Sequence, residues 1–220
     1  MTLSRLEHLV HQPAAGGKPR SVIVILHGLG GSSADYADIG PIWAPMLPQT
    51  EFIVPDGPEP NDTAATGRQW FSTQQRDLRG MMEGVAAAAP ILDGFLDQIL
   101  AERGLDERRM ALIGFSQGAM IALHVGLRRA RAPAGIVGFS GMLLAGPELR
   151  REIRARPPVL LIHGEDDEFV PIAALDAAVT VLRSVGVPVA AERRPSLGHR
   201  VDEGGLQRCL AFLMSALNVD

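Results

Sequence analysis

Short apolar runs alternate with longer segments of helical periodicity along this chain of 220 residues. The runs are rich in Val, Ile and Leu, which is typical of strands buried on both faces of a parallel sheet. We therefore expect a single α/β domain, residues 1–220, with a mostly parallel central sheet and helices on both of its faces. The predicted strands are an edge strand at 3–11, a buried strand at 21–26 and further strands at 51–55, 110–113, 135–139, 157–164 and 187–193. The predicted helices are at 34–47, 81–103, after Gly118, at 171–184 and at the C-terminus.

Prolines and glycines interrupt this pattern in two places. Gly40-Pro41 and Pro45 break the segment 34–47, and Pro90 should kink or divide the helix 81–103. The segment 56–78 is rich in Pro, Asn, Asp, Thr and Gly and is long for a connection in a compact domain. Such loops are usually lids or binding loops, so we expect residues 56–78 to border the functional site.

Composition and charge exclude several classes of function. A net charge of −4 argues against a nucleic-acid surface, and the arginines of 128–131 and 150–156 are expected to be solvated. The single cysteine, Cys209, excludes an intramolecular disulfide, fits a reducing compartment and is expected to be buried in a helix. No signal peptide is apparent and no run approaches the length of a membrane span, which favours a cytoplasmic protein.

The segment from Met110 to Arg131 contains the strongest chemical signal. A strand-like run enters Gly114-Phe115-Ser116-Gln117-Gly118, and a helix-like segment follows. A G-x-S-x-G between strand and helix is the nucleophile elbow of α/β-hydrolases, so the predicted architecture is an α/β-hydrolase fold. The sharp turn strains Ser116, and the close approach of the chain requires glycine on either side. Ser116 is therefore a candidate nucleophile beside a helix N-terminus.

A serine nucleophile needs a base and an acid, which follow it in the order Asp or Glu, then His. His199 lies in a loop before the last helix, where the base is expected. His163 ends a strand, and His27 ends an earlier one, so both are expected to be structural and to bond loop backbone groups. The acid should follow the strand 157–164. Four carboxylates stand there and remain open on position alone: Glu165, Asp166, Asp167 and Glu168.

Four motifs together resemble the carboxylesterase/phospholipase family, which includes bacterial carboxylesterases, lysophospholipases and acyl-protein thioesterases. They are HGLGG at 27–31, GFSQGA at 114–119, HGEDDEFVP at 163–171 and LGH at 197–199, in the family's order and across nearly the whole chain. The resemblance implies that Asp167 is the acid and His199 the base of a triad with Ser116. It also implies that the backbone N–H groups of Leu29 and Gln117 form the oxyanion hole.

The resemblance also suggests residues around the acyl group. Trp70, next to Phe71, matches an aromatic pair that borders the acyl site in the family, although core packing or contact with a second subunit of a homodimer would equally explain an aromatic there. Met142 and Leu143 are weaker candidates for a pocket wall. After Phe71 the chain continues with Ser72 and Thr73 and departs from the familiar thioesterase form, which weakens the case for protein-thioester substrates.

The function implied is hydrolysis of a small-molecule carboxylic ester with a short- to medium-chain acyl group, because no long amphipathic lid is evident. Such hydrolysis needs no metal or organic cofactor. Lysophospholipid or acyl-protein thioester hydrolysis is the alternative within the class, and a non-catalytic ligand sensor on a hydrolase fold is the alternative outside it. The glycines at 28 and 30 could suggest a dinucleotide loop, but Ser33 stands where the third glycine belongs.

Overall fold

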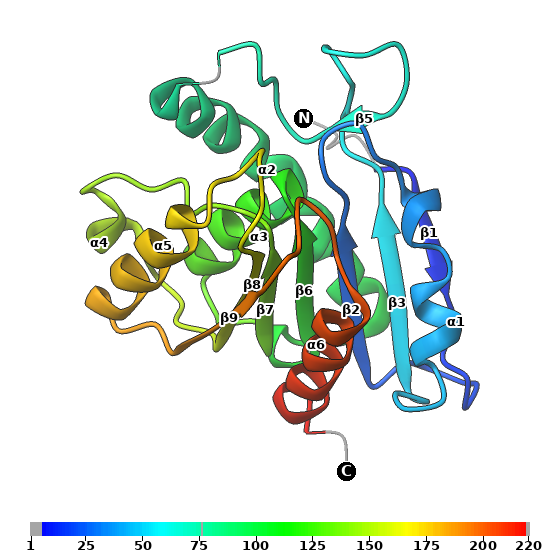
Figure 1. Cartoon of the computed structure of the whole chain (residues 1–220). Coiled ribbons are helices and arrows are strands. Elements are labelled where there is room, and N and C mark those ends of the chain that lie inside the picture. The colour runs from blue at the N-terminus through cyan, green and yellow to red at the C-terminus, as the bar shows by residue number, and fades with distance from the viewer. Residues whose placement is uncertain (1–5, 76, 219–220) are drawn as a thin grey trace.

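A seven-stranded, mostly parallel sheet forms the centre of the molecule (Figure 1). The computed structural model describes residues 6–75 and 77–218. The strand order is β1-β3-β2-β6-β7-β8-β9, and every neighbouring pair is parallel except the antiparallel edge pair β1 and β3. The strands are β1 His8–His11, β2 Ser21–Leu26, β3 Thr50–Pro55, β6 Met110–Phe115, β7 Gly135–Phe139, β8 Val159–Gly164 and β9 Val189–Arg194.

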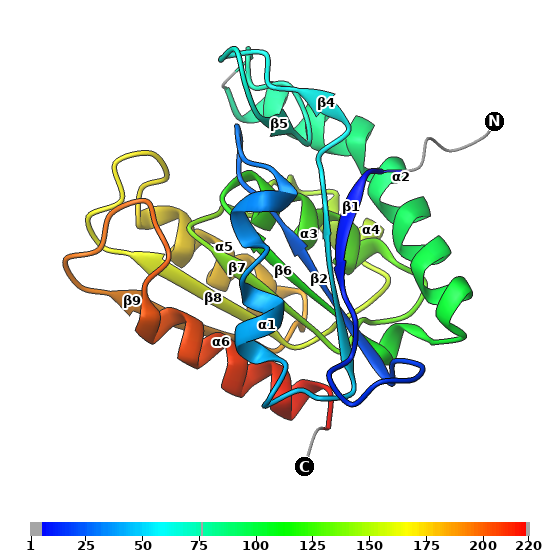
Figure 2. The same cartoon turned by 90° about the vertical axis from the view of Figure 1, so that its right-hand side faces the viewer.

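Helices cover both faces of this sheet, as Figures 1 and 2 show. The helices α2 Leu78–Arg103, α3 Gln117–Arg128 and α5 Ala173–Ser184 contribute to the apolar cluster on one face. The helices α1 Ile39–Trp43 and α6 Glu203–Ala216 contribute to the cluster on the other. In β2, Val22, Val24 and Leu26 face the first cluster while Ile23 and Ile25 face the second. This alternation explains why the strand is apolar at every position, and the predicted α/β architecture is confirmed.

The predicted strands all occur, although the first part of the segment 3–11 lies outside the described residues. The region 34–47 does not form one continuous helix. It contains the 3₁₀ turn η1 Ser33–Tyr36, followed by the short helix α1. The structure adds short elements that the pattern did not indicate. These are the hairpin strands β4 Glu59–Pro60 and β5 Arg68–Gln69, the 3₁₀ turn η2 Glu107–Arg109, and α4 Leu149–Glu152.

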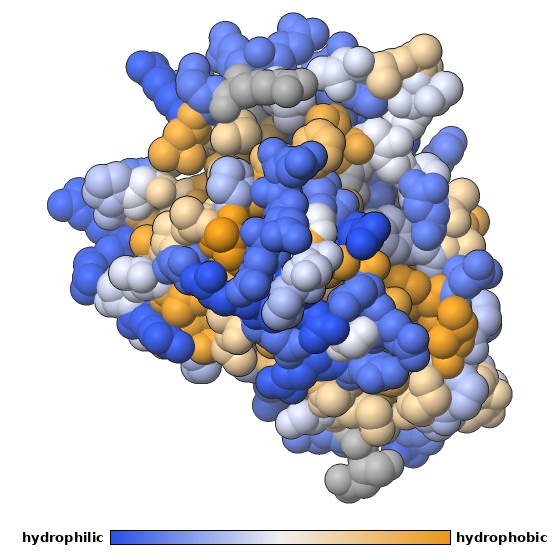
Figure 3. All heavy atoms as spheres, viewed as in Figure 1, coloured by the Kyte–Doolittle hydropathy of each residue, from blue (hydrophilic) through white to orange (hydrophobic). Residues whose placement is uncertain are grey.

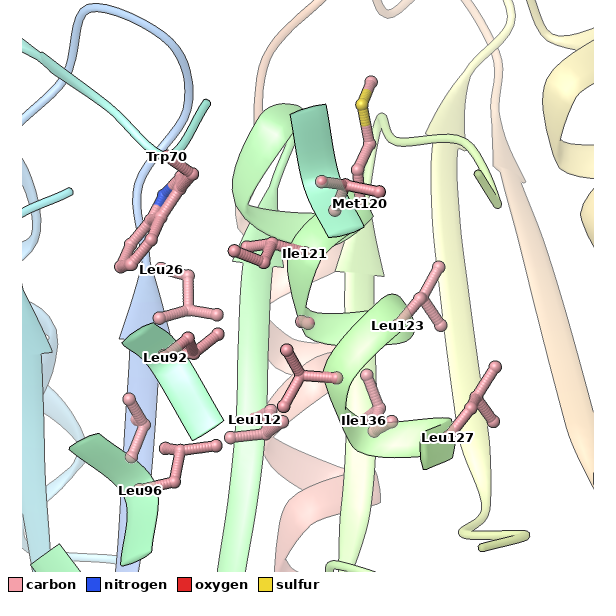
Figure 4. Packing of buried hydrophobic residues seen from close by; sticks show 14 of the residues in the cluster. Leu26, Trp70, Leu92, Leu96, Leu112, Met120, Ile121, Leu123, Leu127 and Ile136 are labelled. Atoms are coloured by element: carbon pink, nitrogen blue, oxygen red, sulfur yellow. The ribbon is translucent and has the colours of Figure 1, made fainter. Parts of the chain in front are cut away.

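Pro90 does not divide its helix, because α2 runs without a break through it. The Asp77 side chain accepts a hydrogen bond from Gly80 N–H at the first turn, and Gly104 ends the helix in the left-handed conformation. Pro90 itself is exposed, whereas the opposite face of α2 packs into the core through residues such as Leu92 and Leu96 (Figure 4). Tertiary packing of that face offsets the hydrogen bond that proline removes.

Two further expectations need correction. By length and composition α2 could cross a membrane, so the expectation that no run approaches that length is wrong for this segment. The core helix of a soluble protein can have the same length and composition. Arg129 is also not solvated. It is 5% exposed, and its guanidinium donates to the carboxylates of Asp93 and Asp97 on α2 at 2.5 and 2.6 Å.

Cys209 is buried as expected, and burial raises the pKa of its thiol.

Candidate active site

The elbow between β6 and α3 positions Ser116. Its backbone angles, φ 52° and ψ −115°, lie outside the regions that residues other than glycine normally adopt. Such strain persists only when the surroundings enforce it. The Ser116 N–H donates to Phe139 O on β7 at 2.8 Å, and Ser116 O accepts from Ala119 N and Met120 N. The candidate nucleophile is thus tied to a neighbouring strand and to the first turn of the following helix.

Glycine is required on both sides of Ser116, as the motif predicts. A Cβ added to Gly118 would lie 2.1 Å from Leu26 O, and one added to Gly114 would lie 2.3 Å from Gly118 O. Both contacts are with backbone atoms that cannot move aside. The close packing of α3 against β2 and β6 therefore depends on these two positions.

The structure brings the three predicted triad residues together. His199 Nε2 lies 3.0 Å from Ser116 Oγ, across 83 residues of sequence, and His199 Nδ1 lies 2.8 Å from Asp167 Oδ2. Asp167 follows β8 and His199 lies between β9 and α6, so all three side chains meet at the carboxyl ends of parallel strands. This is the edge of the sheet at which α/β proteins bind ligands.

The surroundings of Asp167 distinguish it from the other three carboxylates of its loop. Asp167 is buried, whereas Glu165, Asp166 and Glu168 are exposed. Burial alone would raise the pKa of Asp167, but hydrogen bonds from Val170 N–H, His199 and Phe169 N–H outweigh it and lower the pKa. Asp167 Oδ1 accepts the two backbone bonds at 2.8 and 2.9 Å, which leaves Oδ2 for His199. An ionised Asp167 holds the proton on His199 Nδ1 and leaves Nε2 free to accept from Ser116.

Two phenylalanines flank the His199 imidazole, and sequence reasoning missed both. The ring centroids of Phe115 and Phe169 lie 4.9 and 5.2 Å from that of His199. Phe169 is 79% exposed, which is unusual for a large apolar side chain. Its place two residues after Asp167 was the one signal in the sequence that could have identified it.

The other two strand-end histidines make structural contacts. His27 is fully buried; its Nδ1 lies 2.7 Å from Gly28 O, and its Nε2 accepts from Gly57 N–H at 2.9 Å. Burial lowers the pKa of His27, which keeps the ring neutral in this arrangement. His163 Nε2 lies 2.8 Å from Val170 O and 3.3 Å from Asp167 Oδ2, so it supports the loop that carries Asp167.

The amides of Leu29 and Gln117 are available as hydrogen-bond donors near Ser116. Neither donates to a protein acceptor within the part of the chain that the structure describes. Gln117 N–H is the first of α3, where helical geometry leaves amides free. The loop that carries Leu29 passes directly over the elbow, since a Cβ on Gly28 would lie 3.4 Å from Ser116 Cβ.

The three tentative pocket residues have different positions. Trp70 is 1% exposed, and its side chain points into the core toward Leu26 (Figure 4), so the idea of an exposed Trp70 that contacts a second subunit is wrong. Met142 and Leu143 are half-buried just beyond β7. Met142 borders a cavity of about 10 Å³ with Ala119, which is too small to hold an acyl chain. Among residues 6–75 and 77–218, no group of three or more His, Cys, Asp or Glu side chains is arranged to hold a metal ion.

Comparison with known proteins identifies the family. A sequence model of the phospholipase/carboxylesterase family matches residues 10–217. The chain belongs to this family. The predicted resemblance is thereby confirmed, and with it a hydrolase of this family and an α/β-hydrolase fold.

Relatives within the family include enzymes with different names. Esterase YpfH of Escherichia coli (strain K12) is 29% identical over 208 residues, which cover 94% of this chain and 87% of the relative. Acyl-protein thioesterase 1 of Gibberella zeae is 27% identical over 99% of this chain and 98% of its own. The crystal structure of esterase PE8 matches with a TM-score of 0.92 and 33% identity, and covers 97% of this chain and 100% of that chain.

Proposed function

We propose that this hydrolase is a serine esterase that cleaves carboxylic esters through an acyl-enzyme. The observation that carries the proposal is the connected line of hydrogen-bonding atoms from Asp167 through His199 to Ser116, at 2.8 and 3.0 Å. Nucleophile, base and orienting acid in this geometry are the arrangement that activates a serine hydroxyl.

Each residue then has a defined role. Ser116 Oγ attacks the acyl carbon while His199 Nε2 takes its proton, and Asp167 stabilises the imidazolium that forms. The carbonyl oxygen becomes an oxyanion held by the N–H groups of Leu29 and Gln117. The intermediate collapses, the C–O bond to the alcohol breaks, and His199 protonates the leaving oxygen. Water then repeats the sequence on the acyl-enzyme and releases the acid, with no metal or organic cofactor.

The proposed substrates are small, soluble esters of short- to medium-chain acids. Two aspects of the site support this choice: the fold includes no long amphipathic lid within the described residues, and the apolar side chains of Leu29 and Phe169 are exposed. Lysophospholipid or acyl-protein thioester hydrolysis is the second candidate, favoured by the match to Acyl-protein thioesterase 1 over almost the whole chain.

The single cysteine, which is buried, fits a reducing compartment such as the cytoplasm.

Replacement of the nucleophile tests the reaction type. We expect Ser116→Ala to lower kcat on p-nitrophenyl acetate or butyrate by roughly 10⁴- to 10⁶-fold, because the acyl-enzyme cannot form. A fluorophosphonate probe should label the wild-type protein and not the variant. Labelling of folded Ser116→Ala, or retention of most of its esterase activity, would refute the assignment of the nucleophile. Absence of both activity and labelling in the folded wild type would favour a non-catalytic ligand sensor.

A substrate series separates the two candidate functions. The proposal predicts that kcat/KM is highest for p-nitrophenyl esters of short to medium chain length and falls for long chains. A lysophospholipid and an acyl-peptide thioester are measured beside them at equal concentration. A higher kcat/KM on either of these would select the second candidate, while the effect of Ser116→Ala should be the same on all substrates.

A further inference from the structure

The two proposed oxyanion donors lie on segments far apart in the sequence, and a third segment bonds to both. The Gln117 side chain is 2% exposed and pairs with this third segment like a backbone amide. Its Oε1 accepts from Trp70 N–H at 2.9 Å, and its Nε2 donates to Phe71 O at 2.7 Å. The residue whose N–H would hold the oxyanion is thus held by its own side chain.

The same segment also holds the loop that carries Leu29. The Trp70 indole Nε1–H donates to His27 O at 2.9 Å. Arg68 exchanges two backbone bonds with this loop, accepting from Gly30 N–H and donating to Gly31 O, both at 2.9 Å. A Cβ on Gly67 would lie 1.9 Å from Gly30 O, so the two segments are in direct backbone contact.

We propose that residues 68–71 form a fixed brace that sets the position of both oxyanion donors, with Gln117 and Trp70 as its positioning residues. This inference rests on the proposed function, because it assigns a role within the same reaction. The physical reason is that the oxyanion needs two amides at one point in space, and a displacement of about 1 Å can lower the rate about 10²-fold. The hydrogen bonds between Gln117, Trp70 and His27 couple the two donors to one another.

The brace also determines how the segment 56–78 behaves. If residues 68–71 moved as a lid, Gln117 and the His27 carbonyl would lose their hydrogen-bond partners inside the protein. A buried polar group left unpaired loses its bonds to water without gaining a replacement, which is strongly unfavourable. Residues 68–71 therefore stay in place during turnover, and any opening is confined to other parts of the segment.

Two substitutions remove the side-chain contacts of the brace. Gln117→Met removes both side-chain hydrogen bonds, and Trp70→Phe removes the indole N–H while leaving an aromatic ring. For each we expect kcat on p-nitrophenyl acetate to fall about 10- to 100-fold with KM changed less than about threefold, because the donors act on the oxyanion of the transition state. The affinity for an alkylboronic acid, whose serine adduct places an oxygen at the oxyanion position, should fall in proportion to kcat/KM.

Thr50→Val is the matched control. Thr50 is also buried and its side chain is hydrogen-bonded to Ser21 Oγ at 2.8 Å, but this pair lies at the first residues of β2 and β3, at the opposite end of the sheet from the site. We expect this variant to lose stability and keep kcat within about twofold of the wild type. The variant with both Gln117→Met and Trp70→Phe should lose less than the product of the two single effects, since both act through one brace.

The outcomes separate the brace from the proposed function. Wild-type kcat and boronate affinity in folded Gln117→Met and Trp70→Phe would overturn the brace and leave the esterase intact. A loss of kcat without a loss of boronate affinity, or an equal loss in Thr50→Val, would also overturn it. If Gln117→Met does not fold, Trp70→Phe decides alone. Failure of the proposed function is a different result, namely a folded wild type that neither hydrolyses esters nor reacts with a fluorophosphonate.

Discussion

At the scale of single residues, the site depends on how each side of the His199 imidazole is occupied. Asp167 Oδ2 holds Nδ1, Ser116 Oγ faces Nε2, and Phe115 and Phe169 lie against the ring. The ring is thereby fixed in the orientation in which Nε2 can take a proton. Since Phe115 lies in the elbow and Phe169 lies in the loop of Asp167, both neighbours are positioned by the segments that carry the other residues of the proposed triad.

Phe169 provides a test at this scale. Its side chain is largely exposed beside His199, so Phe169→Ala should leave the free energy of unfolding within about 0.5 kcal/mol of the wild type. We expect it to raise KM for p-nitrophenyl esters by roughly two- to tenfold, because it removes apolar surface at the mouth of the site. Ile42→Ala is the control, since Ile42 is 62% exposed on α1. Equal KM values in the two variants would exclude Phe169 from substrate binding.

At the scale of elements, the elbow is the part of the fold that the sequence predicted most completely. A serine between two glycines, after an apolar run and before a helix, predicts a tight strand-to-helix turn with the serine in a strained conformation. Contacts of that turn with neighbouring elements, such as the bond from Ser116 N to Phe139 O, depend on which strands become neighbours. For the same reason the pattern did not indicate the hairpin strands β4 and β5. They contain only two residues each, and β5 is held by contacts with the loop 27–31.

Glycine substitutions test the packing of the elbow. Gly118→Ala places a Cβ 2.1 Å from Leu26 O, so α3 must move away from β2. We expect a loss of more than about 3 kcal/mol in the free energy of unfolding, or failure to fold, together with loss of fluorophosphonate labelling. Gly198→Ala is the matched control, because the nearest atom to its Cβ would be Asp166 O at 3.7 Å and its φ is not positive. A stable, fully labelled Gly118→Ala would contradict the close approach.

At the scale of the whole molecule, two apolar clusters on the two faces of the sheet hold the site's loops in register. The surface on the side seen in Figure 3 mixes hydrophilic and hydrophobic residues, with the apolar ones in several separate areas.

The buried imidazole of His124 is incompletely hydrogen-bonded. His124 on α3 is 8% exposed, and its Nδ1 has no hydrogen-bond partner within the described residues. Burial, and then the charge of Arg128, lower the pKa of His124 to about 4.

This histidine makes the stability of the fold depend on pH. The unfolded chain binds a proton at His124 below about pH 6.5, whereas the native protein does so only below about pH 4, so stability falls as pH falls between these values. The full shift corresponds to about 3 kcal/mol. Asp167, whose pKa is lowered, contributes stability above about pH 4 that is lost only as the pH falls through its folded pKa.

The variant His124→Leu should remove this dependence. We expect urea unfolding to show that its stability relative to the wild type increases as the pH is lowered from 7.5 to 4.5, since a leucine binds no proton and leaves no buried nitrogen unpaired. Parallel curves of unfolding free energy against pH for the two proteins would show that His124 is not protonated preferentially in the unfolded state.

The sequence by itself determined the α/β architecture, the elbow and the candidates for the proposed triad. These features follow from local rules: periodicity, the turn chemistry of glycine, and the order of polar residues at strand ends. Only the tertiary structure decided that Trp70 is buried, that Arg129 is paired with α2, and that residues 68–71 connect the two halves of the proposed oxyanion hole. The reason is that burial and side-chain hydrogen bonds depend on which distant segments become neighbours, and a pattern read along one chain does not contain that information.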